Sequence, residues 1–326
     1  EFDPTGGLDT DKMRAALESS QAARGPMLGR VASLTLHGGL SIETTLDPGI
    51  QPFLRDHQIE GTPLLPGVMG IEAFAEAAHC LFPAWHIEAV ENVNFLVPLK
   101  FYRNQPRMLT IEALIRPLGA GLIADCRLSG RRKVPNLPEP QVTTHFTGRV
   151  RLARQSLPAI TKPRLGSPAG PMITADDIYR VYFHGPAYQV VERAWWDGVR
   201  LIAQLAANLP ANHHPPELNT AISPRLIEFC FQSAGLWELG VLGQLGLPQY
   251  VEQVRLLRAP ELADGPLYSI IAPHSQPSHF DVEVLDAAGN VYLQLTGYRT
   301  VVLPEGVDAN AVKALQALMS LQSVAA

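Results

Sequence analysis

Two long segments with helical character stand among many with strand character, and this contrast constrains the fold more than any other feature. One segment begins after Pro66 and reads GVMGIEAFAEAAHCLF, and the other begins after Pro224 and reads RLIEFCFQSAGLWELG. Both are apolar on nearly every side, which is typical of a helix enclosed by the rest of the fold. Each helix must therefore be surrounded by other elements, and the available elements are strands.

Most of the sequence between the two ends of the chain has the pattern of β-strands. Alternation of apolar and polar residues over 40–46 predicts a strand with one buried face. Similar β-branched or alternating character marks six further segments: 107–115, 142–152, 188–196, 198–209, 280–285 and 291–302. The sequence from Asp286 to Asn290, DAAGN, predicts a hairpin turn between the last two strands.

A proline-rich segment, residues 155–173, divides the chain and predicts a semi-rigid linker. We expect a first unit over 30–154 and a second unit over 174–304. Each unit would hold several antiparallel strands around one buried helix, which is an α+β fold. In the second unit, Thr174 and Asp177 predict a capping box that starts a short helix.

The two ends of the chain, residues 1–29 and 305–326, are expected to be peripheral segments that lead to neighbouring domains. Helical patterns over 9–23 and 308–322 predict one helix in each. The chain begins with Glu1 and has no initiator methionine, basic n-region or apolar h-region. We therefore expect residues left by cloning and a piece of a longer protein.

Composition argues against several classes of partner. The net charge is −5, and the densest basic run, a triplet at 131–133, indicates a solvated turn rather than a nucleic-acid surface. Cys80, Cys126 and Cys230 form no CxxC pair and are expected to be reduced thiols of a cytoplasmic protein. No apolar run reaches the roughly 18 residues of a membrane-spanning helix. We expect neither a nucleic-acid partner nor membrane insertion.

One histidine stands just ahead of the first buried helix, in the pattern His57-x3-Gly61-x4-Pro66. With 10 His, 26 Gly and 28 Pro in the chain, about 0.07 copies of this pattern are expected by chance, so the motif alone is suggestive. A loop histidine whose glycine and proline serve the turn is an equally good interpretation. Arg55 and Asp56 could orient the imidazole, but we expect them to be solvated.

A carboxyl group and an amide, Glu228 and Gln232, lie four residues apart in the second buried helix and therefore on one face. Glutamate is rarely buried, so a solvent-facing Glu228 is the ordinary expectation. Its neighbours are apolar, however, and Gln232 adds a second polar group to the same stripe. Two aligned polar groups in an enclosed helix favour a lined cavity.

A third segment of interest reads YRVYFHGPAYQ. Its Gly185-Pro186 pair ends a helix and turns the chain into a strand. We expect His184 to be a helix-end histidine whose ring is satisfied by C-terminal carbonyls. We expect Tyr182 to pack in the core, and Tyr188 either to pack there or to line a tunnel.

Other patterns that carry chemistry are missing from the sequence. His213 and His214 stand in a proline-rich loop with no carboxylate or cysteine at ligand spacing, so a metal site is not expected. The glycines form neither a P-loop nor a dinucleotide fingerprint, and no serine occupies a nucleophile elbow.

Four separated motifs, in the same order, resemble the dehydratase domains of polyketide synthases. They are Leu54–Gly67, Phe183–Gln189, the Glu228–Gln232 helix and Gly297–Pro304. The resemblance spans approximately 30–304 and is closest in character to iterative, enediyne and polyunsaturated-fatty-acid synthases. It implies a double-hotdog fold, in which two units each wrap a curled antiparallel sheet around a central helix.

The resemblance also implies roles for individual residues. His57 would be the catalytic base and Glu228 the acid. The substrate-binding or orienting positions would be Gln232, Gly61, Pro66, Gly67, Tyr182, Gly185, Pro186 and Tyr188. Among these, Gln232 would position the carboxyl group or the substrate hydroxyl. Gly61 and Pro66 would shape the loop beneath the thioester.

Two positions depart from the family pattern. The family usually has aspartate where this chain has Glu228, although stand-alone fatty-acid dehydratases of the superfamily pair a glutamate with their histidine. The family usually has tyrosine before Gly-Pro, where this chain has His184, with Tyr182 two residues earlier. That wall of the implied pocket therefore differs from the family pattern.

The implied reaction starts with a β-hydroxyacyl chain on the phosphopantetheine arm of an acyl carrier protein. His57 would remove a proton from the carbon next to the thioester carbonyl, and backbone N–H groups at the start of the 66–82 helix would stabilise the enolate. Glu228, if protonated, would give its proton to the departing hydroxyl. If ionised, it would hold the hydroxyl while His57 shuttles the proton. No metal, flavin or nicotinamide cofactor is needed.

The implied partners are the acyl carrier protein and neighbouring domains of a megasynthase, while monomer and homodimer stay open. Hotdog proteins can also be thioesterases, isomerases or cyclases. A non-catalytic acyl-binding module is the alternative from a different class. The sequence does not specify the chain length, substitution or stereochemistry of the acyl group.

Overall fold

The computed structural model describes residues 25–35, 37, 39–132, 139–166, 172–197, 200–302, 310, 312–313 and 316–317. The predicted helix over 9–23 and most of that over 308–322 lie outside these residues. By their contacts, the segments of the chain group into two compact units. The first comprises Glu1–Arg55, Thr62–Leu157 and His213–Pro224, and the second comprises Asp56–Gly61, Pro158–Asn212 and Arg225–Ala326. The domain boundaries expected from the sequence stay predictions.

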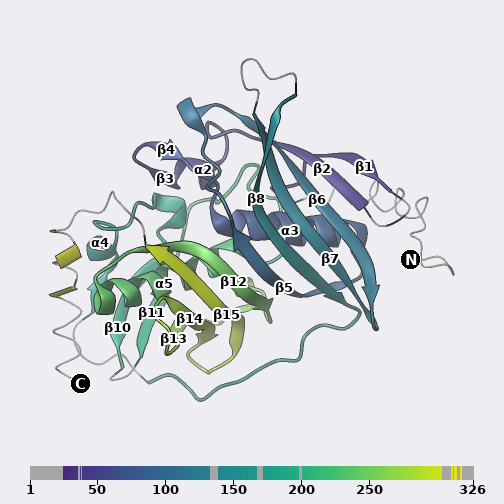
Figure 1. The fold of residues 1–326 in the computed structure, drawn as a ribbon. Coiled ribbons are helices and arrows are strands. Elements are labelled where there is room, and N and C mark those ends of the chain that lie inside the picture. The colour runs from purple at the N-terminus through teal and green to yellow at the C-terminus, as the bar shows by residue number, and fades with distance from the viewer. Residues whose placement is uncertain are drawn as a thin grey trace. The chain divides into compact units, whose positions relative to one another are not determined.

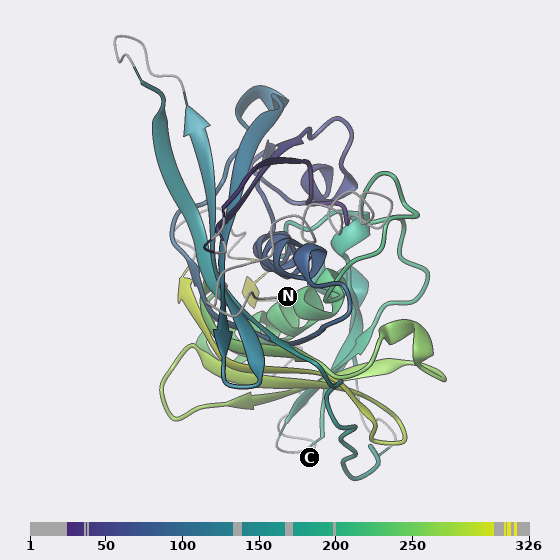
Figure 2. The same cartoon turned by 90° about the vertical axis from the view of Figure 1, so that its right-hand side faces the viewer.

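The first unit is an antiparallel sheet with one long helix. Its strand order is β1-β2-β6-β7-β8-β5. The strands are β1 (Arg30–Leu34), β2 (Gly39–Leu46), β5 (His86–Phe95), β6 (Arg107–Leu118), β7 (Gly121–Arg132) and β8 (Gln141–Ala153). The helix α3 (Gly67–Leu81) packs against β5 to β8 (Figure 1), and Figure 2 shows it nearly end on beside the curled strands. The short elements α2 (Pro52–Arg55), β4 (Thr62–Pro63) and η2 (Tyr102–Asn104) also belong to this unit.

The second unit repeats this architecture, with strand order β12-β15-β14-β13-β11-β10-β9 and antiparallel pairing throughout. The strands are β9 (Ile173–Thr174), β10 (Val191–Trp196), β11 (Leu201–Leu205), β12 (Gly246–Leu256), β13 (Leu267–Pro273), β14 (His279–Asp286) and β15 (Val291–Val302). The other elements are β3 (Gln58–Ile59), α4 (Ala175–Ile178), η3 (Pro186–Tyr188), α5 (Pro224–Leu242) and η4 (Pro260–Leu262).

The long helix α5 packs against three strands of its unit through side chains on several of its faces. Phe231 stacks on Tyr298 of β15, with ring centroids 4.4 Å apart. The Ser233 hydroxyl lies 2.7 Å from the Ser269 hydroxyl of β13. The ring of Trp237 packs against Phe280 of β14, with centroids 5.5 Å apart. These contacts and the burial of most of α5 agree with the prediction of an enclosed helix.

The sequence predicts no membrane-spanning helix. No helix among the described residues combines the length and the apolar character needed to cross a membrane.

Several strands appear where the sequence predicts them. In β2 the alternation is confirmed, because Leu40, Ile42, Thr44 and Leu46 are buried. Strands β6, β8, β14 and β15 coincide with four other predicted segments. A period-two pattern therefore marked these strands even where, as between β14 and β15, the register shifts.

Four long strands, β5, β7, β12 and β13, were not singled out by the sequence pattern. In β5 the register shifts between Ile87 and Ala89 and again between Glu91 and Asn94. A bulge of this kind places two residues opposite one and interrupts the alternation. In β12 a similar irregularity follows Pro248. In β5 and β12 the alternation is thus interrupted where the backbone leaves the regular pleat.

Local predictions in the second unit are confirmed in part. Thr174 and Asp177 form the predicted capping box at the start of α4, with the Thr174 hydroxyl 2.7 Å from the carboxylate of Asp177. The strand predicted over 188–196 begins only at Val191, because residues 186–188 form the 3₁₀ turn η3. Because Pro186 starts this turn, the extended backbone of the strand begins only after the turn.

The predicted hairpin turn between β14 and β15 is confirmed. Its Gly289 has a φ of +91° and donates its N–H to the carbonyl of Asp286 at 3.0 Å. Residues 158–166 of the proline-rich linker pass beside this turn, since the N–H of Lys162 donates to the carbonyl of Gly289 at 2.8 Å. The linker is therefore held against the second unit.

Helix α3 is enclosed as predicted, but it carries two buried carboxyl groups, Glu72 and Glu76. Glu72 accepts hydrogen bonds from the N–H groups of Ala221 and Ile222, the latter at 3.1 Å. Glu76 accepts from the N–H of Met27 at 3.0 Å. A hydrogen bond also joins the two carboxyl groups. The pair therefore ties two distant backbone segments of the first unit to one helix.

Burial dominates the titration of this pair. It raises the pKa of Glu72 from 4.5 to about 7, against the lowering effect of its backbone donors and of the hydrogen bond with Glu76. Burial and the neighbouring Glu72 charge raise the pKa of Glu76 well above its ordinary value. Glu76 is therefore the protonated partner near neutral pH, and Glu72 is the group that titrates there.

The raised pKa of Glu72 predicts a pH-dependent stability. The folded state binds this proton more tightly than the unfolded chain, so its contribution is full below pH 4.5 and is lost as the pH rises through about 7. A shift of this size corresponds to a stability change on the order of 3 kcal/mol. Urea titrations across this range should give a flatter pH dependence for Glu72→Gln than for the unaltered chain. Parallel pH profiles for the two proteins would contradict the assignment.

Candidate functional site

Two histidines from distant parts of the chain lie side by side in the second unit. His57 and His184 form an isolated antiparallel β-bridge, and the N–H of Gly185 donates to the carbonyl of Asp56 at 2.7 Å. Bridge partners project their side chains to the same side of the backbone. The two imidazole centroids are accordingly 5.4 Å apart, with an angle of 63° between the rings.

Asp56, the residue before His57, stabilises this pairing. Asp56 is buried, and its carboxylate accepts a hydrogen bond from the N–H of Ala187 at 2.8 Å. Arg55 is exposed as expected, but the expectation that Asp56 is solvated is wrong. Its carboxylate satisfies a buried N–H that the turn at 186–188 leaves without a ladder partner.

Gly185 is required at this position by close packing. A Cβ atom added there would lie 2.9 Å from the Cβ of Asp56, which is closer than real Cβ contacts. Pro186 then starts the turn η3. These two residues therefore shape the His184 segment, and a direct role in substrate binding stays a prediction for both.

His184 meets the carboxyl group of Glu228. Its Nε2 lies 3.1 Å from Glu228 Oε1, and the two side chains are only 8% and 6% exposed. The expectation of a helix-end histidine is wrong, because α4 ends at Ile178 and the ring instead faces a side chain of α5. Sequence reasoning missed this role, although His184 occupies the position at which the chain departs from the family pattern.

Gln232 holds Glu228 in place. Its Nε2 donates to Glu228 Oε1 at 2.9 Å and to the carbonyl of Tyr188 at 2.9 Å. Its Oε1 accepts from the hydroxyl of Tyr179 at 2.8 Å. Both N–H groups of the Gln232 amide are therefore hydrogen-bonded within the protein. Of the two roles expected for Gln232, the geometry favours positioning of the carboxyl group over contact with a substrate hydroxyl.

Tyr179 is a further residue that sequence reasoning missed. Its hydroxyl also accepts from the N–H of Val191 at 2.8 Å, so it links the start of β10 to α5. Burial raises its pKa, and the nearby Glu228 charge also raises it, although the bond from Val191 lowers it. The hydroxyl therefore remains a donor to Gln232. The only sequence signal was a tyrosine shortly after the capping box.

Tyr182 and Tyr188 are both buried, as the core interpretation predicts. The hydroxyl of Tyr182 donates to the backbone carbonyl of Gln232 at 2.8 Å. The ring of Tyr188 packs at an angle of 70° to the imidazole of His57, with centroids 6.0 Å apart. Tyr182 thus supports α5 and Tyr188 supports the imidazole, while substrate contact stays a prediction for both.

The charge state of Glu228 follows from competing effects. Burial, the largest, raises its pKa, but the hydrogen bond and charge of His184, the charge of His57 and the bond from Gln232 together outweigh it. The net pKa of Glu228 lies below its ordinary value of 4.5. The carboxyl group is therefore ionised near neutral pH despite its burial.

The remaining predicted positions lie at the edges of these segments. Gly61 has a φ of +72°, a conformation that favours glycine, at the turn after β3. Pro66 and Gly67 belong to the first unit, where they start α3. A Cβ added at Gly67 would lie 2.7 Å from the ring of Phe95. The predicted roles of all three beside a thioester stay predictions.

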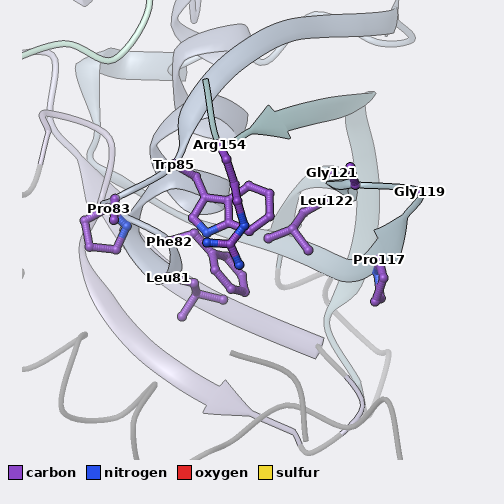
Figure 3. Close-up of a pocket in the computed structure, with 11 residues that line it drawn as sticks. Leu81, Phe82, Pro83, Trp85, Pro117, Gly119, Gly121, Leu122 and Arg154 are labelled. Carbon is purple, nitrogen blue, oxygen red and sulfur yellow. The ribbon is translucent and has the colours of Figure 1, made fainter. Parts of the chain in front are cut away.

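A pocket of about 620 Å³ lies on the first unit (Figure 3). Leu81, Phe82, Trp85, Leu122 and Arg154 are among the residues that line it, and the guanidinium of Arg154 lies 4.5 Å from the Trp85 ring centroid. The lining has no histidine or carboxylate. This pocket therefore offers no acid–base pair for the predicted chemistry.

Comparisons with protein families agree with the expected family. A model described as polyketide synthase dehydratase domain matches residues 25–117. A second, described as polyketide synthase dehydratase N-terminal domain, matches residues 162–310.

Similar curated proteins are much longer than this chain. Polyketide synthase ThaG of Burkholderia thailandensis is 26% identical over 260 residues, which are 77% of this chain and 4% of that protein. Pikromycin polyketide synthase component PikAII of Streptomyces venezuelae is 28% identical over 223 residues, or 66% and 6%. A polyunsaturated fatty acid synthase polypeptide of Thraustochytrium is 22% identical over 275 residues, or 76% and 9%. The chain spans less than a tenth of each relative.

Solved structures show the same fold. The dehydratase domain from the CurF module of curacin polyketide synthase matches with a TM-score of 0.68 and 17% identity, covering 86% of this chain and 100% of that one. A trans-AT polyketide synthase dehydratase domain from Brevibacillus brevis matches with a TM-score of 0.66 and 18% identity, covering 86% and 99%. The predicted α+β double-hotdog fold is confirmed.

The carboxylate of Asp56 predicts a measurable contribution to stability. In Asp56→Ala the buried N–H of Ala187 loses its acceptor, which should lower the free energy of unfolding by about 1–3 kcal/mol. Asp56→Asn keeps a side-chain oxygen and should lose less. Urea denaturation of the three proteins measures the difference. Equal stability of Asp56→Ala and the unaltered chain would contradict the contribution.

Proposed function

Because the chain belongs to the polyketide synthase dehydratase family, we propose that it removes water from a 3-hydroxyacyl thioester. The product is the α,β-unsaturated thioester, and the acyl group is carried on the phosphopantetheine arm of an acyl carrier protein. The observation that carries this proposal is the cluster of two imidazoles and one ionised carboxylate in the second unit. Loss of water requires a base at the α-carbon and polar groups at the β-hydroxyl, and this cluster contains both kinds of group.

His57 is the base in this proposal. Its imidazole takes the proton from the carbon next to the thioester carbonyl. The ring is held by aromatic edges, with Phe183 at 5.2 Å and Tyr188 at 6.0 Å between centroids. Its backbone is fixed through the bridge to His184. A base held on several sides loses little orientational freedom when the substrate arrives.

Glu228 acts at the β-hydroxyl as a carboxylate. Its lowered pKa supports the ionised state, which was the second of the two alternatives left open by the sequence. A carboxylate accepts a hydrogen bond from the hydroxyl and so orients the breaking C–O bond. It has no proton of its own to give, so in this proposal His57 carries the proton taken from the α-carbon to the leaving oxygen, which departs as water.

The partners follow from the same family. The curated relatives are many times longer than this chain and are named as polyketide or polyunsaturated fatty acid synthases. We propose that neighbouring domains of such a synthase, and its carrier protein, surround this chain. The reaction transfers a proton and releases water with no net oxidation, so it needs no redox cofactor, and the proposed residues supply the acid–base groups without a metal.

Mass spectrometry tests the proposal directly. The chain is incubated with a panel of 3-hydroxyacyl carrier proteins, and the acyl group should lose the mass of one water. His57→Ala and Glu228→Ala should each abolish this loss while their far-UV circular dichroism stays unchanged. His86→Ala, at an exposed histidine of β5, is the matched control and should retain activity.

Other outcomes would point to the rival functions. Release of a free acid would indicate a thioesterase. A shifted double bond would indicate an isomerase, and a cyclic ether would indicate a cyclase. Full turnover by His57→Ala would refute its role as the base.

A further inference from the structure

Five cationic side chains gather at one end of the first unit. They are Lys100, Arg103, Arg107, Arg131 and Arg132, and we refer to them as the cationic surface. Lys100 and Arg103 lie in the loop between β5 and β6. Arg107 begins β6, and the other two end β7. Four of the five are exposed, and Arg107 is partly buried.

Arg107 joins the loop to the strands. Its Nη1 donates to the carbonyl of Lys100 at 2.8 Å. A Cβ atom added at Gly130, which directly precedes Arg131 in β7, would lie 3.1 Å from its Nη2. Burial and the charge of Arg132 lower the pKa of Arg107, in agreement with a short separation of the two guanidinium groups. The loop and the end of β7 therefore present their charges together.

The cationic surface differs from the arginines elsewhere on the same sheet. Arg127, for example, pairs with Glu112 at 2.7 Å. Among the described residues, none of the five cations forms an ion pair, although Asp47 and Glu139 stand close to them in sequence. The chain as a whole has a net charge of −5. This local excess of positive charge attracts a partner whose facing surface is acidic.

Apolar side chains are exposed among these cations. They are Leu96, Val97, Tyr102, Met108 and Val142. Tyr102 directly precedes Arg103, and Val142 is the strand partner of Arg131. Tyrosine, methionine and arginine are enriched where proteins bind one another, and a group of exposed apolar residues marks such a place. The combination of apolar and cationic groups fits a protein partner better than a free anion.

The loop is held at the end of the unit where α3 begins. The N–H of Leu65 donates to the carbonyl of Leu99 at 3.0 Å. The N–H of Phe101 donates to the carbonyl of Pro63 at 2.8 Å. Pro66, which caps α3, follows directly. The family resemblance implies that Pro66 lies beneath the thioester, so a carrier protein that delivers this thioester approaches the same end of the unit.

Resting on the proposed function, we propose that the cationic surface docks the acyl carrier protein of the synthase through an acidic face of that protein. The exposed apolar side chains pack against the centre of the acidic face, and the cations contact its carboxylates. Attraction between opposite charges speeds the encounter and orients the carrier protein. The surface takes no part in the chemical step, so it acts on the KM of substrates that are bound to the carrier protein.

Two substrates with the same acyl group separate docking from chemistry. One is a 3-hydroxyacyl carrier protein that the unaltered chain dehydrates, and the other is the 3-hydroxyacyl pantetheine thioester, which has no protein attached. Arg103→Glu and Arg131→Glu each reverse one exposed charge, the first in the loop and the second on β7. Each should raise the KM for the carrier protein by about tenfold and keep kcat/KM for the pantetheine thioester within about twofold of the unaltered chain.

Arg164→Glu is the matched control, because this exposed arginine lies in the linker and belongs to the second unit. It should leave the kinetics of both substrates unchanged. Added salt should raise the KM of the unaltered chain for the carrier protein more than that of Arg103→Glu, since the variant has less attraction for salt to screen.

Equal KM values of the two variants and the unaltered chain for the carrier protein would overturn the proposal. Equal losses on both substrates would overturn it as well, because the arginines would then act on the fold or on the chemistry. Binding of a DNA duplex, or a dimer in sedimentation, that both variants weaken at unchanged KM would assign the surface to that partner instead. An unaltered chain that dehydrates neither substrate would refute the proposed function itself.

Discussion

The short backbone pairing between 56–57 and 184–185 is the constraint on which the candidate site depends. It brings His57 next to His184 and groups the segment 56–61 with the second unit rather than with its sequence neighbours. A main-chain pairing this short would by itself be a weak tether. The buried carboxylate of Asp56 strengthens it by accepting from the N–H of Ala187, which lies 131 residues away in the chain.

Two buried carboxyl groups in this chain have pKa values shifted in opposite directions, and their partner groups explain the difference. Glu72 and Glu228 are both fully enclosed, and burial raises the pKa of each. Around Glu72, the backbone donors and the hydrogen bond with Glu76 lower the pKa by less than burial raises it, so burial prevails. Glu228 has the imidazole of His184 and the amide of Gln232, which outweigh burial. Burial alone therefore does not predict whether a carboxyl group is ionised, because the partner groups decide it.

The glutamates on the two central helices also differ in their hydrogen-bond partners. On α3 the carboxyl groups accept from backbone N–H groups and secure loops of the first unit. On α5 the carboxylate faces an imidazole whose second nitrogen is without a partner among the described residues. The same residue type thus has backbone partners on α3 and a side-chain partner on α5.

The main elements of the fold were predictable because they depend on local periodicity. Both enclosed helices, the alternation in β2 and the capping box at Thr174 appear where expected. In β5, which was not predicted, bulges shift the register and interrupt the alternation. Whether a bulge forms depends on the neighbouring strand, which the local sequence does not specify.

The sequence by itself determined that Glu228 and Gln232 share one face of an enclosed helix, since residues four apart align in any α-helix. It also singled out His57 through its glycine and proline. Only the tertiary structure decided that Asp56 is buried and that His184 meets Glu228, 44 residues further along the chain. Contacts of this kind depend on how distant segments pair and pack, and no local spacing encodes them. The ionised state of Glu228 is likewise a property of the folded chain, because it requires that imidazole at hydrogen-bonding distance.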